Sequence, residues 1–328
     1  MKNNLIVAGR RDASIDVLRC IAILGIVIAH CTSNLLLIQL RSFDVALMVF
    51  LSAVCSKNFN TENFNYFDYF TKRCMRLIFP VWIFLTLYYV GVYIFYFLPP
   101  HAEILSGYML LSDRYVWIIR ILVLLSLMAP FLYKLTEKVT PLNLLLILCI
   151  SCIICEVTFS IQNNKWVNLT LMTIPYGIIY LLGMNIASLS RKQIVGLIFA
   201  ISFVLIGIAI YLFMKEGHFV PTSNYKYPPQ IYYLSYAVAF TLFLWVSRDK
   251  IQSFLTSLHL AAFFKYVGRH TYWLYLWHIP FVDIFSKDYT FPIRFSIIFF
   301  GALSCVFIQD IIVRRFVTNK KLAVVFNG

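Results

Sequence analysis

Two residues of one apolar segment, His30 and Arg19, have the types and the spacing of a site for a long anionic ligand. His30 lies deep in the stretch IAILGIVIAHCTS, and Arg19 precedes it. On a helix the two would lie about 16 Å apart along the axis and within roughly 20° of one face. An imidazole can take up and return a proton near neutral pH. We interpret His30 as an acid–base candidate; the alternative is a histidine that only hydrogen-bonds a neighbouring helix.

A short basic cluster before the third apolar stretch offers a second anion contact. Lys72, Arg73 and Arg76 precede the sequence LIFP, which ends at Pro80. On a helix, Arg73 and Arg76 point to the same side because they are three residues apart. Paired guanidinium groups suit phosphate binding. The alternative is an anchor that holds lipid headgroups at the membrane surface.

Few other ionisable residues fall inside apolar stretches, where they usually face a pathway or a site. Glu156 has no cation near it in sequence, so it is interpreted as a relay acid, a protonated core residue or a group near the outer surface. Arg120 is a candidate partner for it in space. Cysteines at 149, 152 and 155 do not predict a metal centre, because no fourth thiolate follows. The other ionisable residues of this kind are Asp44, His278, Asp283 and Asp310.

The elements that must position these residues are membrane-spanning helices. Hydrophobic residues make up 61% of the 328 positions and charged residues only 13%, against about 25% charged in ordinary soluble domains. This composition excludes a soluble globular protein and a disordered chain. The net charge of +14 would suggest nucleic acid in a soluble protein. Here the basic residues lie between apolar stretches, so we expect membrane lipids and no nucleic acid as partners.

A spanning helix needs about 20 apolar residues. The sequence predicts an all-α, polytopic bundle of about ten transmembrane helices, and most of the 28 Lys and Arg residues fall in alternate breaks between them. This bias places both termini in the cytoplasm. No long loop is present, so we expect one transmembrane domain over 1–328 and no extramembrane catalytic domain. The predicted spans are 20–38, 43–56, 77–98, 115–133, 142–160, 171–188, 194–214, 230–247, 266–285 and 293–313.

Taken in order, these segments resemble acyltransferase family 3, membrane proteins that O-acylate bacterial surface glycans and lipid-linked sugars. Ala53 and Tyr115 depart from the pattern, which commonly has Gly and His there. The matching stretches are Ser14–Ala22 for "DxLRxxA", Phe43–Ser52 for "VDxFFxxSG", Arg73, Arg76 and Pro80 for "RxxR…P", Tyr115–Pro130 for "HxWFL…P", Gly183 for "LLG" and Tyr275–Pro280 for "YLxHxP".

The resemblance implies an O-acetyltransferase of the bacterial inner membrane. Its donor would be cytoplasmic acetyl-CoA, and its acceptor a sugar hydroxyl on a cell-envelope polysaccharide or an undecaprenyl-linked carrier. His30 would be the catalytic base, with a transient acyl-histidine as the variant. No metal is implied. The expected contacts of the CoA phosphates are Arg19, Lys72, Arg73 and Arg76, and the expected supporting residues are Asp16, Asp44, Ser52, Trp117, Arg120, Glu156 and His278. The alternative function is export or flipping of a glycan without acyl transfer.

Overall fold

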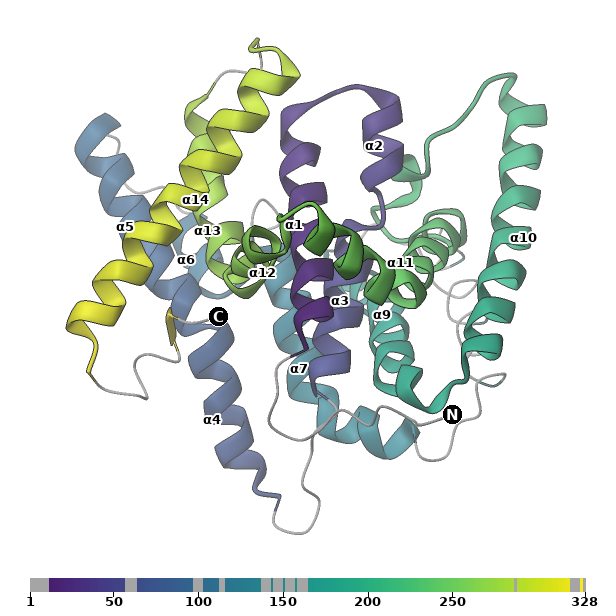
Figure 1. The fold of residues 1–328 in the computed structure, drawn as a ribbon, viewed down its shortest axis with the longest axis horizontal. Coiled ribbons are helices and arrows are strands. Elements are labelled where there is room, and N and C mark those ends of the chain that lie inside the picture. Colours follow the sequence, from purple (N-terminus) through teal and green to yellow (C-terminus); the bar gives the residue numbers. More distant parts are fainter. Residues whose placement is uncertain are drawn as a thin grey trace.

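A computed structural model describes residues 12–56, 64–96, 103–111, 116–136, 165–285, 288–318 and 325–326, with residues 143, 150 and 157 singly. Every regular element in these ranges is helical, as the sequence predicts (Figure 1). The helices are α1 (Ala13–Cys31), α2 (Leu35–Arg41), α3 (Asp44–Ser56), α4 (Tyr66–Leu77), α5 (Phe79–Tyr96), α6 (Glu103–Tyr108), α7 (Trp117–Thr136), α9 (Lys165–Asn185), α10 (Arg191–Glu216), α11 (Ile231–Ser257), α12 (Ala261–Arg269), α13 (Thr271–Ile284) and α14 (Phe291–Phe316), with short 3-10 turns η1 (Ile186–Ser188) and η2 (Thr222–Tyr225).

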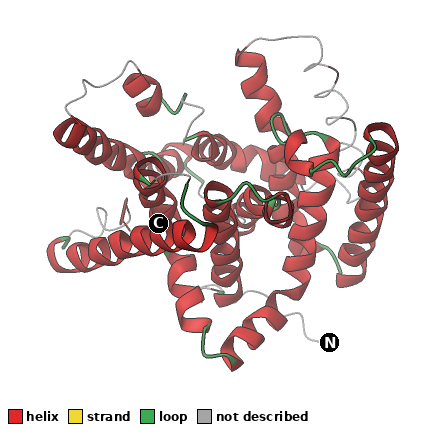
Figure 2. Ribbon diagram, turned by 90° about the horizontal axis from the view of Figure 1, so that it is seen from above, coloured by secondary structure: helices red, strands yellow, loops and turns green. Residues whose placement is uncertain are grey.

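Helix α1 is the central element of the bundle. It packs against α3, α11, α12, α13 and α14, and it stands in the middle of the ribbon view of Figure 1. Figure 2 shows the same bundle of helices from above. The side chain of Asp12 caps its first turn by accepting a hydrogen bond from the Ser14 N–H. Val17, Leu18 and Cys20 are fully buried. A helix that is apolar around most of its circumference belongs inside a bundle, so α1 is placed where a site can form along its length.

Two glycines allow other segments to approach α1 closely. A Cβ atom at Gly25 would lie 3.0 Å from the Cβ of Asp44, the first residue of α3. A Cβ atom at Gly268 in α12 would lie 1.8 Å from the backbone oxygen of Asp16. These positions bring the start of α3 and the end of α12 directly against α1.

Seven helical segments among the described residues are long and apolar enough to cross a membrane. The chain is thus built as a multi-pass membrane protein. The predicted span 142–160 lies outside the described residues apart from three isolated positions. The seven segments are Ala13–Cys31, Leu35–Ser56, Tyr66–Ile94, Trp117–Lys134, Arg191–Glu216, Ile231–Ser257 and Phe291–Phe316, and Met172–Ser188 is a shorter apolar helix.

Two predicted spans are interrupted helices in the structure. The span predicted over 20–38 ends at Cys31, and Asn34 then starts α2 by accepting hydrogen bonds from two backbone N–H groups. The span predicted over 266–285 breaks at His270, between α12 and α13. The sequence stays apolar across both breaks, so composition alone does not reveal them. The helices end there because polar side chains at these positions can hydrogen-bond the backbone.

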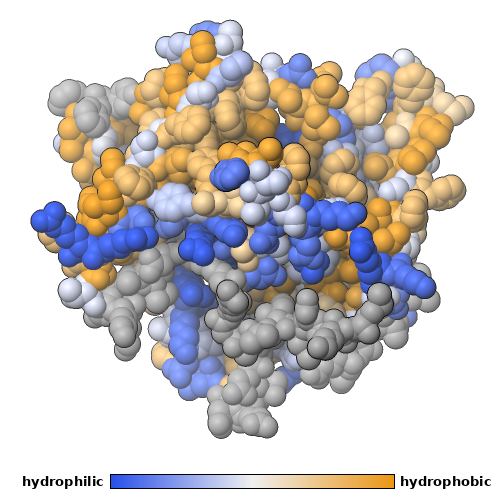
Figure 3. All heavy atoms as spheres, in the orientation of Figure 1, coloured by the Kyte–Doolittle hydropathy of each residue, from blue (hydrophilic) through white to orange (hydrophobic). Residues whose placement is uncertain are grey.

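The visible surface is strongly apolar over its upper part, and hydrophilic residues gather in a band across its lower half (Figure 3). Helix α10 contributes to the apolar surface, with Phe199, Phe203 and Met214 each more than 70% exposed. Exposed apolar area of this extent fits contact with lipid rather than water.

Candidate active site

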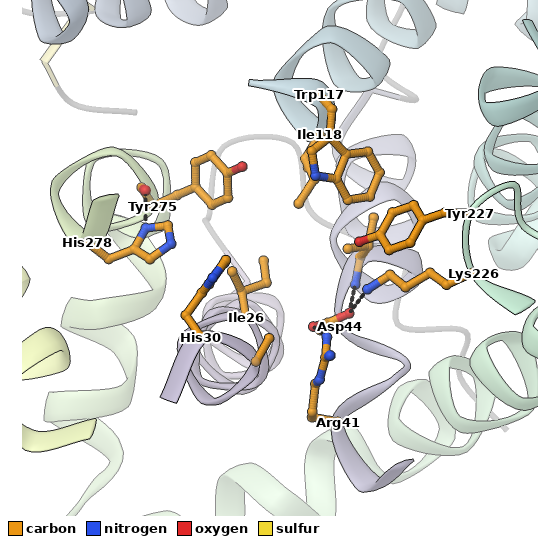
Figure 4. Close-up of a pocket in the computed structure, with 12 residues that line it drawn as sticks. Ile26, His30, Arg41, Asp44, Trp117, Ile118, Lys226, Tyr227, Tyr275 and His278 are labelled. Carbon is orange, nitrogen blue, oxygen red and sulfur yellow. Dashed lines mark hydrogen bonds and ion pairs between the residues drawn. The ribbon is translucent and has the colours of Figure 1, made fainter. Parts of the chain in front are cut away.

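Twelve residues enclose a cavity of about 210 Å³ beside the C-terminal half of α1. This end of the bundle also holds α2 and the turn η2 (Figure 1). The lining side chains come from five different parts of the chain and face one another across the space (Figure 4). They are Ile26, Ala29, His30, Arg41, Asp44, Val45, Trp117, Ile118, Lys226, Tyr227, Tyr275 and His278.

Two imidazole rings form one wall. His30 of α1 and His278 of α13 have ring centroids 5.3 Å apart. His278 is almost fully buried, and its Nδ1 contacts the backbone oxygen of Tyr275. Because a carbonyl only accepts hydrogen bonds, Nδ1 carries the hydrogen and Nε2 of the neutral ring presents a lone pair. The wall therefore holds two groups that can accept a proton.

A buried charge cluster forms the opposite wall. The Asp44 carboxylate accepts hydrogen bonds from Arg41 Nη1 at 3.0 Å, from Lys226 Nζ at 3.2 Å and from the Val45 N–H at 2.7 Å. Asp44 and Lys226 are 1% and 3% exposed. Burial lowers the pKa of Lys226, and the adjacent Asp44 carboxylate opposes that shift. With three donors on it, Asp44 positions two cations and is poorly placed to act as a base.

Aromatic side chains close the space between these walls. Trp117 and Tyr227 make an edge-to-face contact with ring centroids 5.4 Å apart. Trp117 is buried, whereas Tyr227 is 57% exposed. The cavity thus combines flat apolar faces with a few polar groups, which is typical of small-molecule sites.

Two of the predicted donor contacts converge at the other end of α1. Arg19 donates from Nη2 to the Cys55 sulfur at 3.3 Å, and Arg73 donates from Nη2 to the Ser56 hydroxyl at 3.2 Å. Cys55 and Ser56 are adjacent residues at the end of α3. The structure therefore brings together two guanidinium groups that lie 54 positions apart in sequence. Lys72 and Arg76 are exposed on the same helix as Arg73.

Asp16 holds a further cation at this end. Its carboxylate is 1% exposed and lies 3.7 Å from Arg19 Nη1 and 3.6 Å from Arg269 Nε. Arg269 was predicted to lie inside a span. The structure corrects that position: it is the last residue of α12, with its side chain 54% exposed.

Residues 12–313 match the sequence profile of a family described as an acyltransferase domain. The chain belongs to acyltransferase family 3. No curated protein and no solved structure matches it. Since all twelve residues that line the cavity fall within the matched region, the site described above lies wholly within the family domain.

The acyltransferase brings four predicted residues into one cavity and leaves others outside it. His30, Asp44, Trp117 and His278 all line the space. Asp16 lies at the other end of α1. Ser52, Arg120 and Glu156 do not line the cavity: Ser52 accepts a hydrogen bond from Ser56 through its backbone, Arg120 is buried with Nη1 3.4 Å from the Leu110 oxygen, and Glu156 lies outside the described residues.

Sequence reasoning missed Lys226, Tyr227 and Arg41 as site residues of the acyltransferase. Arg41 and Lys226 were interpreted only as loop cations. The spacing of Arg41 and Asp44, three residues apart, was an available signal of an ion pair. No local pattern indicated Lys226, because its contact with Asp44 joins residues 182 positions apart.

Proposed function

We propose that this acyltransferase transfers an acetyl group from cytoplasmic acetyl-CoA to a hydroxyl of a cell-envelope polysaccharide or a lipid-linked sugar, across the bacterial inner membrane. The observation that carries the proposal is the placement of His30 in the wall of a cavity on the same helix as Arg19. One end of α1 offers guanidinium groups, and the other offers a partly buried proton acceptor.

The cationic end suits the phosphates of the donor. Arg19 and Arg73 meet at the end of α3, and each retains N–H groups beyond the one bond described above. Guanidinium groups bind phosphate through paired hydrogen bonds. Lys72, Arg76 and Arg269 add exposed cations at the same end of the bundle. In this proposal the phosphates stay here, and the thioester reaches inward toward the cavity.

His30 would act on the acceptor hydroxyl. The imidazole accepts the hydroxyl proton while the sugar oxygen attacks the thioester carbonyl carbon. A C–O bond forms, the C–S bond breaks, and the leaving thiolate takes up the proton from His30. A base that serves both steps returns to its starting state, so the reaction needs no other proton source.

Replacement of His30 tests the proposal. His30→Ala should lower acetyl transfer by about 10²- to 10⁴-fold, the usual contribution of a positioned acid–base group, while acetyl-CoA still binds. Transfer is measured with purified protein in detergent, and in cells by the gain of one acetyl mass on envelope glycans. His218→Ala is the matched control, because His218 is an exposed histidine beyond the end of α10. Unchanged transfer in the His30 variant would remove His30 from the mechanism.

A further inference from the structure

The cavity lining has more cationic than anionic side chains, and this excess indicates the charge of the acceptor. Of its twelve lining residues, Arg41 and Lys226 are cationic and Asp44 alone is anionic. When both imidazoles are neutral, Arg41, Lys226 and Asp44 give the cavity one net positive charge, and this charge lies on the wall opposite His30. A buried charge without a counter-charge is costly, so this wall favours an anionic ligand.

The two cations retain hydrogen-bond donors beyond those that Asp44 uses. Lys226 has three N–H groups, and its described polar partner is the Asp44 carboxylate, with the rings of Tyr227 and Tyr233 each 5.7 Å from Nζ. Arg41 uses Nη1 for Asp44, while its buried Nε has no hydrogen-bond partner among the described residues. Asp44 thus holds two cations in place without consuming their capacity to bind an anion.

A third cation lies on α14, a helix that packs against α1. Arg294, in the first turn of α14, is 5% exposed, and its Nε has no hydrogen-bond partner within the described part of the chain. This cation adds to the positive charge around the helix that carries His30, because α14 packs against α1.

The dimensions and the aromatic walls indicate what carries the anion. A volume of about 210 Å³ is smaller than the roughly 300–1,000 Å³ of sites for drug-sized ligands, so it suits one small unit rather than several. Trp117 and Tyr227 offer rings against which the apolar face of a sugar can pack. Figure 4 shows these rings on the same side of the cavity as Lys226 and Asp44, across from the two histidines.

We propose that the acceptor is a sugar unit bearing an anionic group, a carboxylate or a phosphate, which binds Lys226 and Arg41 while its hydroxyl faces His30. This inference rests on the proposed function and names the acceptor class for the same site. It also gives the buried cluster a role in selection: a neutral sugar leaves the positive charge of the wall uncompensated, whereas an acidic sugar neutralises it.

Binding of matched sugar probes tests the proposal. Methyl glucuronide and methyl glucoside differ only in the carboxylate, and glucose 6-phosphate supplies the phosphate. Calorimetry with the full chain in detergent should show at least about 10-fold tighter binding of one acidic probe than of the neutral one. The preferred acidic probe then identifies the source of the anion. Equal affinity for all three probes would overturn the inference.

Variants of the charged wall complete the test. Lys226→Gln should reduce the preference for the acidic probe to near parity, and Lys226→Arg should retain most of it. Lys215→Gln is the matched control, since Lys215 is an exposed cation, 61% accessible, at the end of α10. A preference that survives in a folded Lys226→Gln protein would overturn the inference. Because these measurements report binding alone, a failure of acetyl transfer in the same preparation would count against the proposed function and not against the acceptor class.

Discussion

At the scale of single residues, the second imidazole is the group whose role geometry defines most closely. His278 donates from Nδ1 to the Tyr275 backbone oxygen, which leaves Nε2 as an acceptor next to His30. A backbone partner fixes both the tautomer and the orientation of an imidazole. We interpret His278 as a positioning residue that orients the His30 ring or an intervening water.

Replacement of His278 by a ring of similar volume without nitrogen separates this role from packing. His278→Phe should lower kcat by about 10-fold or more, since it removes a hydrogen-bond acceptor beside the base. The KM for acetyl-CoA should change little, because the cationic groups lie at the other end of α1. Steady-state kinetics give both constants. A rise in KM with unchanged kcat would contradict a role beside His30.

At the scale of elements, the close contact between α1 and α12 holds the cationic end of the bundle together. The absence of a side chain at Gly268 lets α12 reach the backbone of Asp16, and Asp16 in turn lies between Arg19 and Arg269. The α1–α12 contact thus positions the cationic end relative to the helix that carries His30.

Adding one methyl group at this contact should loosen it. Gly268→Ala places a Cβ atom where backbone already lies, so α12 must move, at a cost of about 1–3 kcal/mol or more. The thermal unfolding midpoint in detergent should fall by several degrees. Gly207→Ala is the control: nothing lies within 4 Å of its Cβ position, and alanine favours a helix by about 0.5–1 kcal/mol over glycine. Equal midpoints for the two variants would contradict the close approach.

At the scale of the whole molecule, the separation of the two sites requires a defined orientation in the membrane. Helix α10 runs over 26 residues, which is about 39 Å at 1.5 Å per residue, enough to cross the bilayer. The distribution of Lys and Arg predicts that its first residue lies on the cytoplasmic side. The donor contacts would then face the cytoplasm and the acceptor cavity the outside.

Labelling of introduced cysteines at the two ends of α10 tests this orientation. In a background with Cys55 replaced by serine, a membrane-impermeant maleimide should label His218→Cys in intact cells. Lys192→Cys should be labelled only after the membrane is opened. Both native side chains are exposed in the structure, so accessibility to the reagent depends on the membrane side alone. The reverse labelling pattern would contradict the predicted topology.

The sequence predicts the features that depend on local residue patterns, and it misses those that depend on contacts between residues far apart in the chain. The helical class, the positions of most spans and the placement of His30 and Arg19 on one helix follow from apolar runs and helical spacing. The break after Cys31 and the approach of Lys226 to Asp44 do not. The first is set by polar capping within an apolar run, and the second by the way a loop folds back into the bundle. The cavity itself joins five segments, which no single pattern relates.

The stretch of α1 between Arg19 and His30 also has an electrical consequence. Its inward side chains, among them Cys20, Ala22, Ile23, Ile26 and Val27, are each at most 3% exposed. A charge that crossed this layer would move through the membrane potential, which is worth about 2.3 kcal/mol per 100 mV. A tightly packed apolar layer insulates the two compartments from each other. Under the proposed function only an uncharged acyl group would cross this layer, so the transfer would need no path for protons or ions.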